Sequence, residues 1–277
     1  MRGKTIVISG ATSGIGAVAA TRLAEQGARI LFTARDAARA DATLARLHKA
    51  NGAAAHQSFL GDLSLLAEQK RVAREIAAAA PGIDVLINNA GALFNRRTET
   101  ADGLEKTFAL NHMSYFTLTQ LLLPQITDGG RIVNVASRAH RGAVLDFDDL
   151  QSGRGYIGFS VYSRSKLCNI LFTRELARRL PRGITANALH PGFVATRFGD
   201  QSGTVMQALV GLAKRLGAIT PEEGAQTLIF LAASPDVKSV SGRYFYKCRE
   251  ELPSKAAQND ADAARLWEIS QRIFEGV

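Results

Sequence analysis

A tyrosine and a lysine stand four residues apart at Tyr162 and Lys166, within a stretch whose apolar spacing is typical of a helix. Residues four apart share one face of a helix, so the phenol and the ammonium are expected to be neighbours. A free phenol has a pKa of about 10, which is too high for efficient proton transfer at neutral pH. A neighbouring positive charge lowers that pKa because it favours the phenolate. The pair therefore predicts a general acid/base centred on Tyr162.

Ser137 directly follows the apolar segment 131–136, which has the pattern of a buried strand. Its hydroxyl is therefore expected at the carboxyl edge of a sheet, where it can hydrogen-bond a carbonyl oxygen that gains negative charge. A serine at a strand end is by itself more often a turn residue, and a tyrosine and lysine four apart are common. Their joint occurrence favours chemistry at a carbonyl group.

A glycine-rich turn, Ser9-Gly10-Ala11-Thr12-Ser13-Gly14-Ile15-Gly16, lies between a predicted strand at 5–9 and a predicted helix at 15–26. Glycines let the backbone approach a pyrophosphate, whose charge then meets the free N–H groups at the helix N-terminus. The spacing differs both from the common dinucleotide fingerprint and from a P-loop. The turn predicts a nucleotide site with contacts at Gly10, Ser13, Gly14, Ile15 and Gly16.

The elements that must position these residues alternate along the whole chain. Strands are predicted at 5–9, 29–34, 54–59, 84–88, 131–136, 185–190 and 244–246. Helices are predicted at 15–26, 37–50, 65–79, 104–123, 161–180 and 222–233. Such alternation indicates an α/β fold, a single doubly wound Rossmann-type domain over residues 1–277. Its mostly parallel, seven-stranded sheet should carry helices on both faces.

The glycine spacing resembles that of the short-chain dehydrogenase/reductase family, and the resemblance continues down the chain. It implies a catalytic tetrad of Asn111, Ser137, Tyr162 and Lys166, in which Asn111 holds a water that relays protons to Lys166. It also implies cofactor contacts beyond the glycine turn. These are the adenine contact, the motif after the fourth strand, the tetrad pair and the nicotinamide-side loop: Asp62, Leu63, Asn89, Ala90, Gly91, Tyr162, Lys166, Pro191, Gly192, Val194 and Thr196.

Cofactor choice depends on the end of the second predicted strand, at Ala34-Arg35-Asp36. An acidic side chain at position 34 would bind the ribose hydroxyls of NAD and repel a 2′-phosphate. Ala34 is small and neutral, and the Arg35 guanidinium can chelate a phosphate. Asp36 is interpreted as the N-cap of the next helix. The sequence therefore favours NADP(H) over NAD, and the charge of oxidised nicotinamide would help to lower the pKa of Tyr162 by about two to three pH units.

The stretch 162–180, the insert at 147–150 and the tail around Leu266-Trp267 resemble the retinol-dehydrogenase-like branch of that family. The resemblance implies a small-molecule substrate, a lipophilic aldehyde, ketone or alcohol. We therefore predict an NADP(H)-dependent oxidoreductase that interconverts a carbonyl and an alcohol. Two alternatives stay open. One is a C=C reductase, because the light-dependent protochlorophyllide reductases share much of the pattern, and the other is a non-catalytic NADP-binding sensor.

Two long connections emerge at the predicted carboxyl edge, at 138–160 and 199–220. Both are candidate walls of a substrate pocket, and we predict that 199–220 is a lid whose apolar positions face the ligand. The alternative for 199–220 is a helix packed on the core. Within the first connection, Arg138 and His140 lie near Ser137, where two positions are open: lining the pocket or, as the sequence favours, a surface loop.

Composition limits the remaining classes of function. The chain is 46% hydrophobic and 21% charged, as in ordinary soluble proteins, and its apolar runs are shorter than the roughly 18 residues of a membrane span. No signal peptide is evident, so we expect a cytoplasmic protein without a membrane span. The net charge of +9 is scattered over the sequence, which favours a solvated basic surface over nucleic-acid binding.

Cysteine and histidine usage adds little further chemistry. Cys168 and Cys248 are too few for a disulfide framework, and Cys168 is expected to pack in the core. The five histidines lack metal-ligand spacing, so no metal site is predicted. In the resembling family the helices at 104–123 and 161–180 commonly pair between subunits, so a homodimer or homotetramer is possible.

Overall fold

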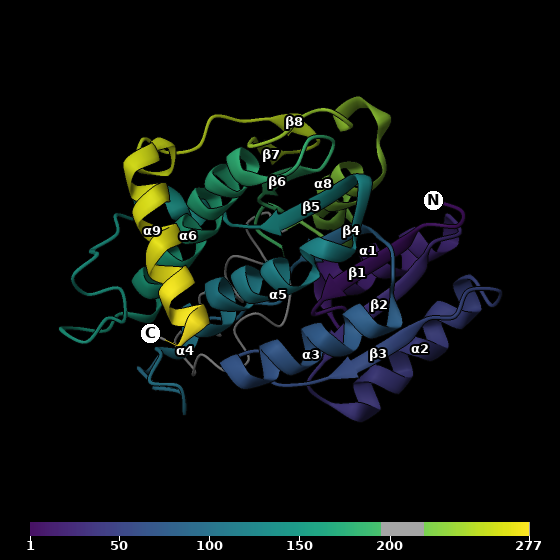
Figure 1. Cartoon of the computed structure of the whole chain (residues 1–277), viewed down its shortest axis with the longest axis horizontal. Helices are drawn as coiled ribbons and strands as arrows, with labels where there is room; N and C mark the ends of the chain where they lie inside the picture. Colours follow the sequence, from purple (N-terminus) through teal and green to yellow (C-terminus); the bar gives the residue numbers. More distant parts are fainter. Residues whose placement is uncertain (195–218, 277) are drawn as a thin grey trace.

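The computed structural model describes residues 1–194 and 219–276, and within them eight strands form one sheet (Figure 1). The order across the sheet is β3-β2-β1-β4-β5-β6-β7-β8, with every neighbouring pair parallel except β7 and β8. The strands are β1 (Thr5–Ser9), β2 (Arg29–Ala34), β3 (Gln57–Leu60), β4 (Ile83–Asn88), β5 (Ile126–Val135), β6 (Thr185–Leu189), β7 (Tyr244–Tyr246) and β8 (Arg249–Glu250). The predicted doubly wound, mostly parallel sheet is confirmed.

The predicted number of strands, seven, is one short because β8 was not expected. It is a two-residue strand that returns beside β7, with Tyr246 paired to Arg249. The two residues between them, Lys247 and Cys248, have φ of 47° and 59°. Such two-residue turns normally use asparagine or glycine, which adopt positive φ at low cost. The sequence therefore carries no signal for this hairpin.

Helices cover both faces of the sheet (Figure 1). One face carries α1 (Gly14–Glu25), α2 (Ala37–Ala50) and α8 (Pro221–Ala233), and the other carries α3 (Leu66–Ala79), α5 (Ser114–Leu122) and α6 (Gly158–Arg179). Side chains alternate across a strand, so in β1 Ile6 and Ile8 join the first core and Val7 joins the second. Both faces are buried, which explains the unbroken apolar runs of the central strands. None of the helices in the described part of the chain is long and apolar enough to cross a membrane.

A further helix, α9 (Asp260–Glu275), was not predicted and lies beside α6 (Figure 1). Its Trp267 stacks on Phe172 of α6, with ring centroids 5.8 Å apart, and meets Phe116 of α5 edge to face at 5.1 Å. The guanidinium of Arg179 lies 4.7 Å from the Trp267 ring. Helix α9 therefore packs on the two helices that the resemblance implies for subunit pairing.

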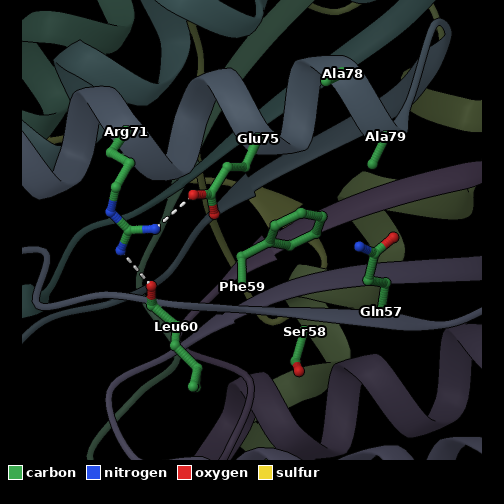
Figure 2. A pocket seen from close by; sticks show the side chains of 8 residues that line it. All are labelled: Gln57, Ser58, Phe59, Leu60, Arg71, Glu75, Ala78 and Ala79. Carbon is green, nitrogen blue, oxygen red and sulfur yellow. Dashed lines mark hydrogen bonds and ion pairs between the residues drawn. The ribbon is translucent and has the colours of Figure 1, made fainter.

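The outer edge of the sheet at β3 borders a surface hollow against α3 (Figure 2). Arg71 reaches across it, donating to the carbonyl oxygen of Leu60 and to Glu75, at 2.6 Å each. Arg71 belongs to α3, and its bond occupies a backbone acceptor of the edge strand that another strand could otherwise use. The lining residues are Gln57, Ser58, Phe59, Leu60, Arg71, Glu75, Ala78 and Ala79. None of them belongs to the site predicted from the sequence, so this hollow is separate from it.

Candidate active site

The glycine turn between β1 and α1 is packed so closely that side chains could not replace its glycines. Gly10 has φ of +72°, and a Cβ atom there would lie 2.9 Å from the Cα of Ala90. A Cβ atom on Gly16 would collide with the carbonyl of Gly10 and lie 2.5 Å from the side-chain nitrogen of Asn89. Helix α1 starts at Gly14, so its first N–H groups face the space above the turn. The turn has the shape that an approaching phosphate requires.

Asn89, predicted as a cofactor contact, holds the glycine turn in place. Its side-chain amide donates to the carbonyl oxygens of Ser9 and Gly10, at 3.0 and 2.8 Å. The Ser9 hydroxyl in return accepts from the backbone N–H groups of Asn89 and Ala90, at 2.9 and 3.1 Å. The loops after β1 and β4 are thereby joined into one surface.

Ser13, Ile15 and Leu63 support this half of the site from the turn and the loop after β3. Ser13 is the exposed N-cap residue of α1, and Ile15 is buried behind the turn. Leu63 is buried, and its carbonyl accepts from Gln69 at 2.8 Å.

The ends of β2 and β3 carry the residues predicted to bind the adenosine half of the cofactor. Ala34 is buried and Arg35 is exposed, so the guanidinium is available at the edge of the sheet. Asp36 accepts from the backbone N–H of Arg39 at 2.8 Å, which confirms it as the N-cap of α2. Asp62, after β3, is fixed by Ser64, whose backbone N–H and hydroxyl donate to it at 3.0 and 2.8 Å. Asp36 is therefore occupied by its helix, which leaves Arg35 as the charged side chain at the end of β2.

Asn111 lies in a π-helical turn, not in the continuous helix predicted over 104–123. The segment divides into α4 (Lys106–Phe108), the π-helical turn η1 (Ala109–Met113) and α5. Widened turns of this kind are frequent at functional sites. The Asn111 side chain exchanges two hydrogen bonds of 2.9 Å with the backbone of Ala92, and donates to the Ser165 hydroxyl at 2.9 Å. These bonds tie the loop after β4 to α6.

Gly91 packs closely against two residues of the tetrad. A Cβ atom at Gly91 would lie 3.1 Å from Oδ1 of Asn111 and 3.3 Å from Nζ of Lys166. A side chain at position 91 would therefore press on both the Asn111 amide and the lysine ammonium.

Ser137 and Tyr162 lie next to each other, close enough for the serine side chain to act on the pKa of the phenol. Ser137 follows β5 and caps the short 3₁₀ turn η3 (Arg138–Gly142), where its Oγ accepts from the N–H of Ala139 at 3.2 Å. Lys166 lies one turn after Tyr162 on α6, is 2% exposed and donates to the carbonyl of Val135 at 3.0 Å. The structure therefore brings together all four residues of the predicted tetrad at the carboxyl edge of the sheet.

Burial dominates the electrostatics of this pair. It raises the pKa of Tyr162 to about 12, against the opposing effect of the Ser137 side chain. It lowers the pKa of Lys166 to about 7. The sequence predicted a lowered pKa for Tyr162, and for the protein's own groups that direction is wrong. The prediction included the charge of an oxidised nicotinamide and took no account of the desolvation of a buried phenol.

The loop after β6 carries the residues predicted to face the nicotinamide. Gly192 has φ of +90°, and its N–H donates to Nδ1 of His190 at 3.2 Å. His190 donates in turn to Glu251 at 3.1 Å and is buried, which lowers its pKa. Pro191 stands between them and is partly exposed. A buried imidazole therefore fixes the geometry of this loop.

Val194 continues this loop and pairs with Ile219 in an isolated bridge. Its side chain packs so closely on α8 that a Cβ atom at Gly224 would lie 2.6 Å from it. Thr196, and all but the last two residues of the predicted lid at 199–220, lie outside the described residues.

The surface position that the sequence favoured for His140 is wrong. The residue is fully buried, and its Nδ1 lies 2.6 Å from the carbonyl oxygen of Ser137. Its Nε2 accepts from the N–H of Ser254 at 3.2 Å, so the proton is assigned to Nδ1 and donated to Ser137. The buried imidazole therefore fixes the backbone of Ser137 relative to the segment at Ser254. Arg138 is exposed, as predicted, and Cys168 is buried, as predicted.

Comparison with known proteins agrees with this geometry. The sequence profile described as short chain dehydrogenase matches residues 4–206. The chain is 42% identical to retinol dehydrogenase 14 of Mus musculus over 286 residues, covering 98% of this chain and 86% of that protein. It superposes on an uncharacterised protein from Mycobacterium paratuberculosis with a TM-score of 0.79 at 31% identity, covering 99% and 94% of the two chains. A short chain dehydrogenase from Burkholderia cenocepacia in complex with NADP gives a TM-score of 0.71 at 27% identity, with coverages of 93% and 99%.

Proposed function

The chain belongs to the short-chain dehydrogenase/reductase family of oxidoreductases, in its retinol-dehydrogenase-like branch, and on that premise we propose a specific reaction. The protein interconverts a lipophilic aldehyde or ketone and its alcohol with NADP(H), and Tyr162 transfers the proton. The observation that supports this most strongly is the position of the buried Lys166 ammonium, 5.7 Å from the ring centroid of Tyr162, with Ser137 next to the phenol at the carboxyl edge of the sheet.

The residues present fit a nicotinamide cofactor along the whole edge. The glycine turn and the start of α1 offer backbone N–H groups to a pyrophosphate. Arg35 offers an exposed guanidinium to a 2′-phosphate, and Gly91 lets the backbone after β4 lie close to the ammonium of Lys166. When bound there, NADPH supplies the hydride. The NADP bound by the relative from Burkholderia cenocepacia supports the same choice.

In the proposed reaction each tetrad residue has a separate role near the substrate oxygen. Tyr162, whose pKa is raised to about 12, is a protonated phenol at neutral pH and so donates a proton to that oxygen in the reductive direction. Ser137 donates a hydrogen bond to the oxygen as charge develops on it. The Lys166 ammonium lowers the cost of the phenolate left behind. Because Asn111 uses its side chain for Ala92 and Ser165, a water relay would have to be held mainly by its backbone.

Apolar side chains near the tetrad support a lipophilic substrate. Phe159 is 55% exposed on the first turn of α6, with its ring centroid 6.5 Å from that of Tyr162. Ile157 and Phe193, just before α6 and after β6, are 72% and 55% exposed. The retinol dehydrogenase name of the mouse relative agrees with such a substrate class. In the proposed function these exposed side chains are the ones that contact a lipophilic substrate.

The experiment that tests the function is a panel of aliphatic, aromatic and polyene aldehydes and ketones with NADPH, followed by cofactor absorbance. We expect turnover that increases with the apolar surface of the substrate. NADPH binding without turnover on any carbonyl compound would instead indicate a sensor.

The rate of carbonyl reduction should depend on pH through Lys166. The group must be an ammonium to stabilise the site, and it is protonated below its pKa of about 7. We expect kcat/KM for NADPH to be constant at lower pH and to fall about tenfold per pH unit above that value, because kcat/KM reports groups of the free enzyme. A profile that stays flat for about two pH units above the lysine pKa would contradict this role.

A further inference from the structure

We propose that Tyr115 is a positioning residue of the catalytic site, which stabilises the Lys166 ammonium through its ring face. This inference rests on the proposed function, since it gives Tyr115 a role that acts through Lys166. Tyr115 is not among the site residues that the sequence predicts.

Tyr115 reaches the site from the first turn of α5 and is fully buried. Its hydroxyl donates to the carbonyl oxygen of Val135 at 3.3 Å, and Lys166 donates to the same oxygen at 3.0 Å. The side-chain amide of Asn169 is a third donor, at 3.3 Å. Three donors from α5 and α6 therefore converge on one carbonyl at the end of β5, two residues before Ser137.

The ammonium also lies against two aromatic rings. Nζ of Lys166 is 5.5 Å from the ring centroid of Tyr115 and 5.7 Å from that of Tyr162. Both distances are within the roughly 6 Å over which a ring face attracts a cation. Tyr162 must also serve the reaction, whereas Tyr115 has its hydroxyl fixed on Val135 and so offers a ring of constant orientation.

The surroundings explain why this ring matters for the charge on Lys166. Of the described residues that face the ammonium, the titratable ones are the phenols of Tyr115 on α5 and Tyr162 on α6. The other neighbours of the ammonium are uncharged: the Val135 carbonyl at the end of β5, and Gly91 with the adjacent Asn111 amide. Burial lowers the pKa of Lys166, and burial keeps the pKa of Tyr115 well above its usual value, so this phenol stays neutral. The ring face of Tyr115 therefore provides part of the stabilisation of the ammonium that a carboxylate would otherwise provide.

The Tyr115 ring is expected to raise the pKa of Lys166. A ring face stabilises the ammonium and so raises the pKa of Lys166 above the value that burial alone would give. Removing the ring should lower this pKa by about one pH unit, the effect of a desolvated cation–π contact. Carbonyl reduction needs the ammonium, so its alkaline limb should move to lower pH by the same amount.

The test separates the ring from the hydroxyl and from packing. Tyr115→Phe keeps the ring, Tyr115→Met fills similar volume without one, and pentafluorophenylalanine at position 115 keeps the shape of phenylalanine but reverses the charge distribution of the ring. Phe116→Leu is the matched control, because it removes the neighbouring buried ring, which packs on Phe172 and Trp267 and does not contact Lys166.

Titration of Lys166 is followed by NMR with lysine labelled with carbon-13 at Cε, the signal being assigned by its loss in Lys166→Met. We expect Tyr115→Phe and Phe116→Leu to titrate within about a third of a pH unit of wild type, and the methionine and fluorinated variants to titrate about one pH unit lower. The fluorinated ring keeps the test valid if the methionine variant does not fold. Equal titration with phenylalanine and its fluorinated form would overturn the inference. This readout needs no turnover, so failure of the proposed function would be seen separately, in the carbonyl panel.

Discussion

Tyr162→Phe is expected to reduce the turnover of carbonyl compounds by at least about 100-fold, because general acid catalysis contributes that much or more. The substitution keeps the buried ring and removes only the hydroxyl, which lies next to Ser137. NADPH should still bind, since the glycine turn, Arg35 and Lys166 remain. The measurements are kcat on the best substrate of the panel and NADPH affinity by fluorescence, so that the loss is assigned to the chemical step.

Tyr156→Phe is the matched control for the loss of a phenol. Its hydroxyl donates to the carbonyl of Phe94 at 2.9 Å, in the connection before α6. Losing this bond should cost about 1 kcal/mol of stability and leave kcat within a few-fold of wild type. A Tyr162→Phe variant with near-normal kcat would show that another group donates the proton.

Arg35→Ala is expected to raise the KM for NADPH by about 10- to 150-fold and to leave NADH nearly unaffected, because charge-assisted bonds to the 2′-phosphate are lost. Arg35 is exposed at the end of β2, and Asp36 beside it is occupied as the N-cap of α2. Ala34→Asp combined with Arg35→Ala should invert the preference, since a carboxylate repels the phosphate and binds ribose hydroxyls. The measurement is kcat/KM for both cofactors in each variant.

Arg39→Ala is the control, because Arg39 is also exposed and lies on the first turn of α2. We expect it to change kcat/KM for NADPH by less than about threefold, because the proposal assigns the 2′-phosphate to Arg35 and an exposed charge without a direct contact contributes little. A wild type that prefers NADH, or an effect of Arg39→Ala that exceeds that of Arg35→Ala, would remove Arg35 from the proposed contact.

The sequence predicts the sheet and its main helices because their patterns arise from burial. Strands such as β1, β4 and β5 are apolar on both faces, and the glycines after β1 are needed by a turn that packs on the next loop. Local patterns of this kind can be read without knowing the rest of the fold. The ends of elements are less well predicted: β3 begins at Gln57, where 54–59 was predicted, and β5 begins at Ile126, where 131–136 was predicted.

The parts that were not predicted depend on contacts between distant segments. The π-helical turn around Asn111 has no distinct composition, and it brings the amide to Ala92 and Ser165 from separate elements. The acceptor shared by Tyr115 and Lys166 is a backbone carbonyl, which has no residue type to recognise. The surface position predicted for His140 was wrong because its partner is a backbone N–H near the C-terminus, at Ser254.

The central claim, hydride transfer from NADPH to a carbonyl carbon with Tyr162 as the proton donor, is tested most directly with an isotope label. A lipophilic α,β-unsaturated aldehyde is reduced with NADPH deuterated on the nicotinamide carbon that gives up the hydride. The position of deuterium in the product is then determined by NMR and mass spectrometry. We predict one deuterium on the carbinol carbon with wild type, and at least about 100-fold slower labelling with Tyr162→Phe. Deuterium on the β-carbon of a saturated aldehyde would identify a C=C reductase and contradict the account, as would equal labelling rates in the two proteins.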